Sequence, residues 1–378
     1  MHLFYILFLF FTFNFSASAS SLPDALAANA KEAILINLNT DTVLYAKNAD
    51  LPTNPSSMTK IMQVYLIFER LKQGRLKMED TFSVSPKAWK TEGSRMFLPV
   101  HSQVSLKDLL LGIVVQSGND ASVALAEGIG GTEENFAREM TETARKLGAT
   151  KSNFVNATGL SGPRHTSTVR DLATISKNLI QNFPDYYHLF SEKFFKFNKI
   201  KQPNRNALLF IPGLGCDGIK TGHTDEGGYG IVASAQQNGQ RLLLVINGTE
   251  SEIERKKVAE DLLNWGFREF ENTLVLKANT SIATPKVSMG TQSRIPVGSL
   301  TDLYATLPRG TYKNFKLRAI YKSIPLKAPI KKGSRVGTLQ VYTPQGAVAD
   351  LPLIALEDSE EAGFLRKIWL KVYETIAG

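Results

Sequence analysis

The chain has 378 residues, of which 43% are apolar and 21% charged, and its 44 basic and 35 acidic residues give a formal net charge of +9. Such a chain is globular and long enough for two or three domains, and its basic excess suits an anionic membrane or wall polymer better than nucleic acid. The single cysteine, Cys216, cannot form an internal disulfide, and the five histidines lack metal-ligand spacing, so neither a metal nor another cofactor is expected.

Residues 1–19 are predicted to form a secretory signal peptide. The apolar run "LFYILFLFFTFNF" is too short to span a bilayer comfortably, and Ala17-Ser18-Ala19 offers a small-residue cleavage site. An uncleaved anchor is the alternative, because only Met1 and His2 precede the run. In either case we expect the mature chain to lie outside the cytoplasm, in the periplasm.

Residues 20–271 are predicted to form one mixed α/β domain. The stretch 32–47 alternates like a β-hairpin, residues 105–147 carry apolar residues three or four apart as helices do, and 216–249 again reads as strands with a tight turn at Asn238-Gly239. Strands at both ends with helices between them indicate that the hairpin and the later strands share an antiparallel sheet beside a helical cluster.

The last hundred residues change character twice. Residues 272–356 contain short alternating runs separated by Pro and Gly, which predict a small β-sandwich-like domain. Residues 357–378 are predicted to form an amphipathic helix with Trp369 on its apolar stripe and Arg366, Lys367 and Lys371 off it. Such a basic helix suits the membrane surface, and the alternative is a helix packed on its own domain.

The segment "PSSMTK" stands where a helix begins, and its serines have two possible explanations. A serine at a helix start is usually a cap for backbone N–H groups. However, residues three apart on a helix lie on one side of it, so Lys60 can bring its amine to the hydroxyl of Ser57. A dry pocket at a helix N-terminus would push that lysine toward its neutral, proton-accepting form.

Two further polar triplets are candidates for the same site. Ser117-Gly118-Asn119 forms a polar break between two apolar helical runs, where side chains can point into a cleft. The similar triplet at 176–178 lies within a continuous helical pattern and is interpreted as a solvated face. Lys220-Thr221-Gly222 lies on a predicted strand and offers a cation and a hydroxyl for a carboxylate, with Gly222 allowing a substrate backbone to come close.

These three motifs, in this order, resemble the set found in penicillin-binding proteins and serine β-lactamases. The surrounding stretches resemble the low-molecular-mass penicillin-binding proteins of the D-alanyl-D-alanine carboxypeptidase type; they are "SSMTKIM", "SGNDASVALAE", "GLSGPRHTSTVRDLA", "NRNALL", "GIKTGHT" and "LLNWGF". The resemblance covers nearly the whole mature chain. It implies a catalytic domain, a small β-rich domain after it and an amphipathic helix on the membrane.

The resemblance implies removal of the terminal D-alanine from the pentapeptide stem of peptidoglycan. Ser57 would be the nucleophile, Lys60 would take its proton, and the backbone N–H groups of Ser57 and His223 would hold the oxyanion. Ser117 would pass the proton to the leaving amine, and Asn119 would hold the substrate amide. β-Lactam antibiotics would be covalent inhibitors.

The terminal carboxylate of the substrate would face Lys220 and Thr221. Arg205, in "NRNALL", is a candidate for a second cation there, with a local structural pairing as the alternative, and Arg255 is a weaker candidate for the same part. His165 is expected to fix a loop, and Cys216 to be a small buried apolar residue.

Three rival functions are weighed. A class A β-lactamase needs a deacylating glutamate after the second motif, and Glu133 and Glu134 lie in an ordinary helical pattern, so slow release of a penicilloyl enzyme is expected. An endopeptidase acting on cross-links would use the same chemistry. A wall-shaping scaffold would use the β domain and the tail, with hydrolysis incidental.

Overall fold

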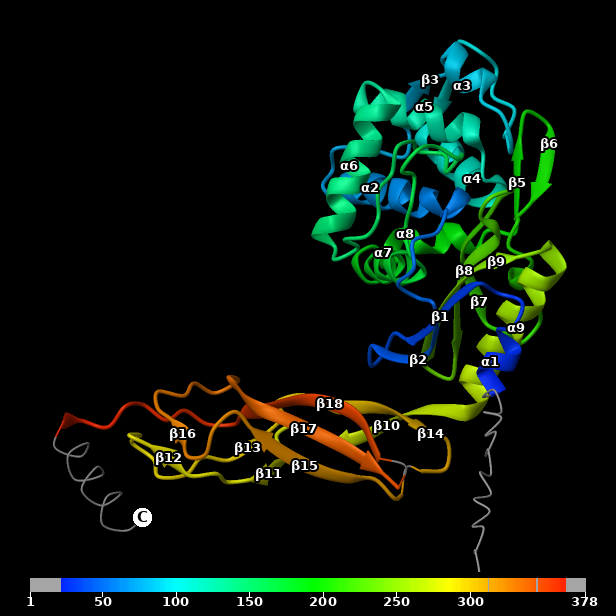
Figure 1. Ribbon diagram of the computed structural model, residues 1–378. Coiled ribbons are helices and arrows are strands. Elements are labelled where there is room, and N and C mark those ends of the chain that lie inside the picture. The colour runs from blue at the N-terminus through cyan, green and yellow to red at the C-terminus, as the bar shows by residue number, and fades with distance from the viewer. Residues whose placement is uncertain (1–21, 312, 345, 365–378) are drawn as a thin grey trace, which may run out of the picture.

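The computed structural model describes residues 22–311, 313–344 and 346–364. Figure 1 shows a larger part built of helices and a sheet, from which a slender part made of strands extends to one side. The mixed α/β class expected from the sequence is confirmed, as is the all-β character of the second part. The predicted signal peptide lies outside the described residues.

A five-stranded antiparallel sheet forms the centre of the larger part. Its strands lie in the order β2 (Thr42–Lys47), β1 (Glu32–Asn37), β9 (Gln240–Thr249), β8 (Gly228–Gln237) and β7 (Cys216–Thr224). The N-terminal hairpin and the later strands therefore share one sheet, as predicted. Asn238 and Gly239 both have positive φ in the β8–β9 turn, as a two-residue hairpin turn requires. Strand β7 lies at one edge of the sheet, and this position matters for the site.

Helices cover both faces of this sheet. On one face α9 (Glu252–Glu269) packs against β8 and β9, and the short α1 (Leu22–Leu26) lies beside it. On the other face α7 (Val169–Asn182) packs against β1 and β9 and connects the sheet to the helical cluster. Because both faces are covered, β9 is buried along nearly its whole length.

The helical cluster is built around α2 (Lys60–Lys72), ten of whose thirteen residues are buried. It packs against α4 (Leu106–Gln116), α5 (Asn119–Gly130), α6 (Glu133–Lys146) and α7. Hydroxyl side chains cap the N-termini of several helices, among them Ser105 on α4, Thr132 on α6 and Ser251 on α9. The remaining elements of this part are η1 (Ser56–Thr59), β3 (Thr81–Ser83), α3 (Pro86–Lys90), β4 (Gln103–Ser105), α8 (Pro184–Tyr187), η2 (His188–Ser191), β5 (Phe194–Phe197), β6 (Ile200–Pro203) and η3 (Ala207–Phe210).

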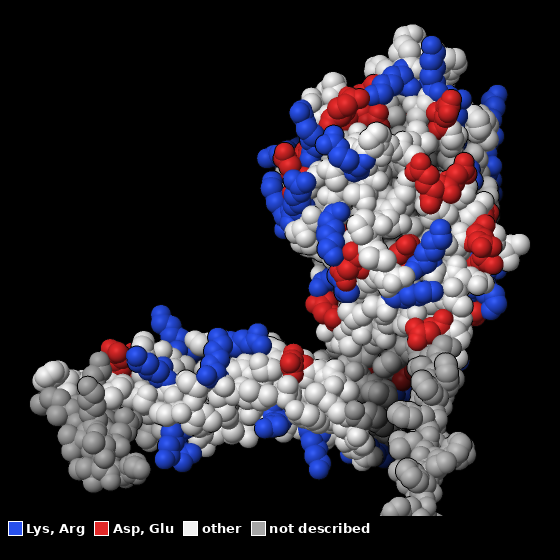
Figure 2. Space-filling model, viewed as in Figure 1, with Lys and Arg blue, Asp and Glu red and all other residues white. Residues whose placement is uncertain are grey.

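The slender part begins at Phe270, directly after α9. Strand β10 (Phe270–Leu276) pairs with β14 (Leu303–Pro308), and a five-stranded sheet has the order β11 (Ser281–Ala283), β13 (Val297–Gly298), β18 (Gly346–Ala355), β17 (Arg335–Thr343) and β15 (Lys316–Tyr321). Short strands β12 (Val287–Ser288) and β16 (Leu326–Lys327) form a parallel pair. Leu339, Leu353 and Val297 are among the residues of its own buried core. In the view of Figure 2, Lys and Arg side chains stud this part, and acidic ones are few.

The start of the predicted C-terminal helix is corrected by the structure. Ser359 forms a β-bridge with Ile330, and Glu361 forms one with Gly290, so residues 357–362 close the β part instead of beginning a helix. The acidic run "EDSEE" carries no apolar stripe that would favour a helix there. The rest of the predicted helix, from residue 365, lies outside the described residues. Within the ranges that the structure describes, no helix is long and apolar enough to cross a membrane.

Candidate active site

Ser57 and Lys60 meet where the 3-10 turn η1 passes into helix α2. The Lys60 amine, fully buried, lies 3.0 Å from Ser57 Oγ, 2.7 Å from Asn119 Oδ1 and 2.5 Å from the carbonyl oxygen of Thr158. A neutral amine has two N–H groups and one lone pair. With both N–H groups donated to Asn119 and Thr158, the lone pair is left for the hydroxyl proton of Ser57.

Burial also prepares Lys60 to act as a base. Desolvation lowers the pKa of Lys60 to about 7, against the opposing effect of the negative charges of Glu133 and Asp120. A large share of the protein therefore carries a neutral amine at neutral pH.

The second motif stands in the break between α4 and α5. Ser117 caps the C-terminus of α4 in a left-handed conformation, with φ of 61°. Its hydroxyl oxygen is buried, and no residue in the described ranges hydrogen-bonds to it. Asn119 begins α5 and is held from both ends of its amide, because its Nδ2 donates to the carbonyl of Glu92 at 2.6 Å while its Oδ1 accepts from Lys60.

The third motif lies on the edge strand β7. Lys220 is buried and donates to the carbonyl of Thr221 at 3.0 Å. Burial lowers the pKa of Lys220 well below its usual value, and the nearby charges of Lys60, Arg205 and Arg255 lower it further.

Gly222 has a structural neighbour that the sequence did not indicate. A Cβ at this position would lie 2.9 Å from Ser56 Cβ and 3.2 Å from the carbonyl oxygen of Pro55. We predicted that this glycine admits a substrate backbone. The close approach that the structure contains is between β7 and the turn that carries Ser57.

The three motifs surround one cavity of about 300 Å³. Its walls include the residues that the sequence analysis selected by number, which are Ser57, Ser117, Asn119, Arg205, Thr221, Gly222 and His223. Thr158, whose carbonyl binds Lys60, is followed by Gly159 and Leu160, which form the opposite wall. The site is therefore assembled from η1, the α4–α5 break, β7 and the 158–160 loop.

Two arginines add positive charge to this cavity. Arg205 is exposed, and its side chain has no hydrogen bond or ion pair with any described residue, which removes the local pairing considered as its alternative role. Arg255 is buried, lies 3.5 Å from a Glu252 carboxylate oxygen and faces the Tyr229 ring at 5.7 Å. With Lys220 beneath them, these cations suit a carboxylate ligand.

The other residues singled out from the sequence are accounted for as follows. His165 Nδ1 accepts the N–H of Val155 at 3.1 Å, so its Nε2 carries the proton and donates to Thr59 Oγ1 at 2.8 Å, as a loop-fixing residue should. Burial lowers the pKa of His165 to about 4, and this histidine stays neutral at pH 7. His223 lies on the cavity rim with its ring stacked on Tyr229 at 3.9 Å.

Cys216 and the second polar triplet take no part in the cavity. Burial raises the pKa of the Cys216 thiol to about 11, which makes it a poor nucleophile. On α7, Lys177 pairs with Asp41 at 2.7 Å. Ser176 differs from the expected solvated face, because it is buried and donates to the carbonyl of Leu172.

Glu133 is a residue of this region that sequence reasoning missed. It begins α6 as the helical pattern indicates, but its carboxylate is buried, accepting the N–H of Ala157 at 3.1 Å and pairing with Lys87 at 3.0 Å. Ala157 precedes Thr158, whose carbonyl binds Lys60. No local pattern marks such a residue, because the segment it holds comes 24 positions later in the chain.

Comparison with known proteins gives matches over almost the whole chain. The D-alanyl-D-alanine carboxypeptidase peptidase family matches residues 17–251, and the C-terminal domain of penicillin-binding protein 5 matches residues 270–361. The D-alanyl-D-alanine carboxypeptidase DacC of Escherichia coli is 39% identical over 368 residues, covering 96% of this chain and 92% of the relative.

Solved structures agree with these sequence matches. Penicillin-binding protein 5 from Haemophilus influenzae superimposes with a TM-score of 0.82 at 37% identity, over 88% of this chain and 98% of that one. A penicillin-binding protein from Listeria monocytogenes, solved with ampicillin bound, matches 63% of this chain and 98% of its own with a TM-score of 0.58 at 29% identity.

Proposed function

The chain belongs to the D-alanyl-D-alanine carboxypeptidase family of serine peptidases, and we propose that its reaction on peptidoglycan stem peptides proceeds through an acyl-enzyme on Ser57. The observation that carries this assignment is the buried Lys60 amine 3.0 Å from Ser57 Oγ, at the base of a cavity shared with Ser117 and Thr221. Nucleophile and base within hydrogen-bond reach, with the base oriented by further groups, is the arrangement that acyl transfer requires.

Acylation begins when the Ser57 hydroxyl proton passes to the lone pair of Lys60. Ser57 Oγ then bonds to the carbonyl carbon of the penultimate D-alanine, and the negative charge moves to the carbonyl oxygen, where backbone N–H groups of Ser57 and His223 stabilise it. Donors of this kind contribute about 3 kcal/mol each in other acyl-transfer enzymes. The proton moves from Lys60 through Ser117 to the leaving nitrogen, the C–N bond breaks, and D-alanine departs. Water then hydrolyses the ester.

The cations around the cavity hold the end of the substrate. Thr221 and Arg205 line the cavity, with Lys220 beneath, so the terminal carboxylate finds a hydroxyl and a guanidinium on one side of Ser57. Asn119 is fixed by Lys60 and by the carbonyl of Glu92, and its Nδ2 lies close to Gly93 on the opposite wall. This places the peptide between β7 and the 92–94 segment.

Penicillin binds covalently by the same route. The ampicillin-bound relative supports this assignment, and here the attacked bond is the β-lactam amide, with Ser57 as the acylated residue. Release of the penicilloyl group is slow, because no described residue takes the place of the deacylating glutamate of class A enzymes; Glu133 is committed to Ala157 and Lys87.

The test combines labelling with product release. Fluorescent penicillin should label the purified protein, the tryptic peptide that contains Ser57 should gain the mass of the penicilloyl group, and Ser57→Ala should remove the label. The unlabelled protein should release D-alanine from a pentapeptide. Labelling without release, but with cleavage of a cross-linked peptide dimer, would favour the endopeptidase function; labelling with neither activity would favour the scaffold, and no labelling would refute the assignment.

Periplasmic location and attachment to the membrane by the C-terminal segment are further parts of this proposal. They rest on the apolar leader, on the basic amphipathic pattern after residue 364, and on the basic side chains of the β part in Figure 2. Deleting residues 365–378 leaves the bridges of Ser359 and Glu361 in place, so it tests the tail alone. The shortened protein should move to the soluble fraction and keep its carboxypeptidase activity. If it still pellets with membranes, an uncleaved leader becomes the anchor.

A further inference from the structure

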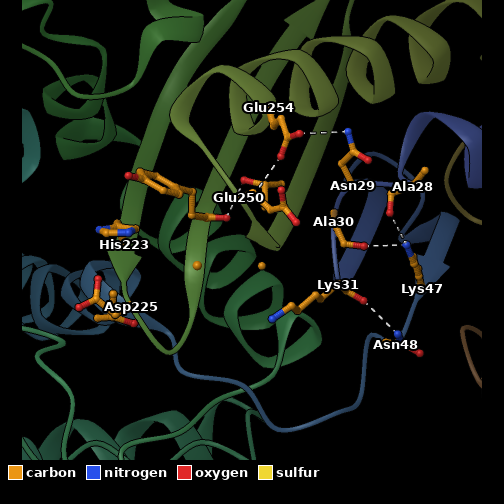
Figure 3. A pocket seen from close by; sticks show the side chains of 15 residues that line it. Ala28, Asn29, Ala30, Lys31, Lys47, Asn48, His223, Asp225, Glu250 and Glu254 are labelled. Atoms are coloured by element: carbon orange, nitrogen blue, oxygen red, sulfur yellow. Dashed lines mark hydrogen bonds between the residues drawn. The ribbon is translucent and has the colours of Figure 1, made fainter.

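A second cavity, of about 900 Å³, opens beside the catalytic one, beyond the turn that joins β7 to β8. Figure 3 shows it between that turn on one side and the segments before β1 and after β2 on the other. His223, Thr224 and Tyr229 line both cavities. The stacked rings of His223 and Tyr229 therefore form the partition, and a long ligand can pass from one space to the other.

The walls of this cavity are held by hydrogen bonds of their own. The Lys47 ammonium donates to the carbonyls of Ala27 and Ala30 at 2.9 and 2.6 Å, which fixes the chain before β1. Glu254 accepts from the N–H of Glu250 at 3.1 Å and from the Asn29 amide at 3.4 Å, which connects the start of α9 to the same wall. These charged groups have structural roles and are occupied.

Three other charged side chains on the lining are not occupied. Lys31, Asp225 and Glu250 have no side-chain hydrogen bond or ion pair with any residue in the described ranges. In Figure 3 the Lys31 side chain crosses the space toward the β7–β8 turn, with Glu250 above it and Asp225 beyond it on the turn. The cavity thus presents one cation and two anions to a ligand that must carry both signs.

The order of groups along β7 gives the direction of the substrate, if the proposed function is correct. Thr221 faces the terminal carboxylate, and His223 supplies a donor to the carbonyl that is attacked. A peptide that runs along the edge strand from its C-terminus toward its N-terminus therefore passes from Thr221 to His223 and on to Asp225. At about 3.3 Å per residue, the residue before the two D-alanines reaches the turn and the second cavity.

We propose that this second cavity is a subsite for the residue that precedes D-alanyl-D-alanine, and that it selects a side chain ending in both an ammonium and a carboxylate group. The carboxylate pairs with Lys31, and the ammonium pairs with Glu250 and Asp225. The subsite sets which stem peptide is cut, while Ser57 and Lys60 perform the reaction.

The test compares three acetylated peptides of the form X-D-Ala-D-Ala. Their X side chains end in an amino-acid head group, in an amine alone (lysine) or in a methyl group (norleucine). Wild-type protein should cleave the first with the highest kcat/KM. Lys31→Met should lower kcat/KM about five- to tenfold for the first peptide only, whereas Glu250→Gln should lower it for the first and the lysine peptide. The norleucine peptide and penicillin labelling should not change in either variant.

Matched controls are Lys256→Met and Glu79→Gln, exposed charges that do not line the cavity, which should leave all three rates within about twofold. Equal losses for all three peptides, or no loss in either cavity variant, would overturn the subsite. If wild type released D-alanine from none of them, the proposed function would fail. The subsite would then be judged by calorimetric binding to Ser57→Ala protein, where preference for the first peptide should again depend on Lys31.

Discussion

Lys60 is made a base by its burial, not by the presence of a strong acid or base beside it. It has no contact with water, and the cost of holding a charge there lowers its pKa to about 7. An exposed lysine would be protonated in nearly every molecule at neutral pH and could not accept the proton of Ser57.

The rate of acylation should therefore depend on pH. The neutral amine is the active form, so the rate of labelling by fluorescent penicillin should fall about tenfold per pH unit below pH 6 and level off above pH 8. Lys220 also has a lowered pKa, and Lys220→Arg replaces it with a group that does not titrate in this range. If Lys60 is the base, the residual activity of that variant keeps the acid limb. A flat profile in wild type would contradict the assignment.

The charge of Glu133 sets where that limb falls. Its carboxylate raises the pKa of Lys60, as does that of Asp120, while the neighbouring Lys220 is cationic or neutral and His165 is neutral at pH 7. Glu133→Gln keeps an oxygen for the N–H of Ala157 but removes the charge. We expect the acid limb to move to lower pH by at least about half a unit.

Glu134→Gln is the matched control for this prediction. Glu134 is exposed and pairs with the same Lys87 at 3.1 Å, so the two variants remove equal charge from the same ion pair. Its profile should stay with that of wild type. Identical shifts in both variants would mean that Glu133 acts on Lys60 through general surface charge alone.

At the scale of elements, the position of Ser57 depends on two glycines in the segments that clasp η1. Gly222 brings β7 against Ser56, and Gly159 brings the 158–160 loop against the same turn from the other side. At Gly159 a Cβ would lie 1.8 Å from the carbonyl oxygen of Ser56. Only a residue without a side chain allows the loop that carries the Thr158 carbonyl to approach Ser57 this closely.

Gly159→Ala should therefore displace the turn that carries Ser57. We expect penicillin acylation to fall more than about tenfold, since small displacements of reacting groups cost large factors in rate. Gly131→Ala separates this effect from backbone strain: Gly131 also has positive φ, 75° against 83°, but no atom lies within 4 Å of its Cβ position. It should lose roughly 1–2 kcal/mol of unfolding free energy and keep its acylation rate. Equal acylation in the two variants would contradict the clasp.

At the scale of the whole molecule, the β part meets the larger part at the far side of the sheet from Ser57. The buried Asn37 on β1 donates to Asn272 Oδ1 at 2.7 Å, and Thr40 and Thr306 share a hydrogen bond of 2.5 Å. Strands β9 and β8 stand between β1 and the catalytic edge strand β7. The β part thus adds no group to the catalytic cavity and can position the enzyme without taking part in the reaction.

Breaking this junction should change stability and leave catalysis intact. Asn272→Ala leaves the amide nitrogen of buried Asn37 without its acceptor, which should lower the free energy of unfolding by about 1–3 kcal/mol. Acylation at 25 °C should equal that of wild type. Asn314→Ala, an exposed asparagine of the same part, should change neither quantity. A loss of acylation in Asn272→Ala would show that the β part acts on the site.

The sequence alone determined the chemical groups, their order and the local elements that carry them. Ser57 and Lys60 at a helix start, Ser117 in a break between helices, and Lys220 on a strand could be read from short-range patterns, as could the Asn238-Gly239 turn, because these properties depend on neighbours along the chain. The same patterns placed the terminal helix about seven residues too early, since the bridges of Ser359 and Glu361 come from distant partners.

Only the tertiary structure decided how those groups work together. The lowered pKa of Lys60, the grip of Glu133 on the 157–158 segment, the clasp of Gly159 and the second cavity around Lys31 all arise where segments far apart in the chain pack against one another. Burial and electrostatic coupling depend on distance in space, and no spacing along a single sequence specifies that distance.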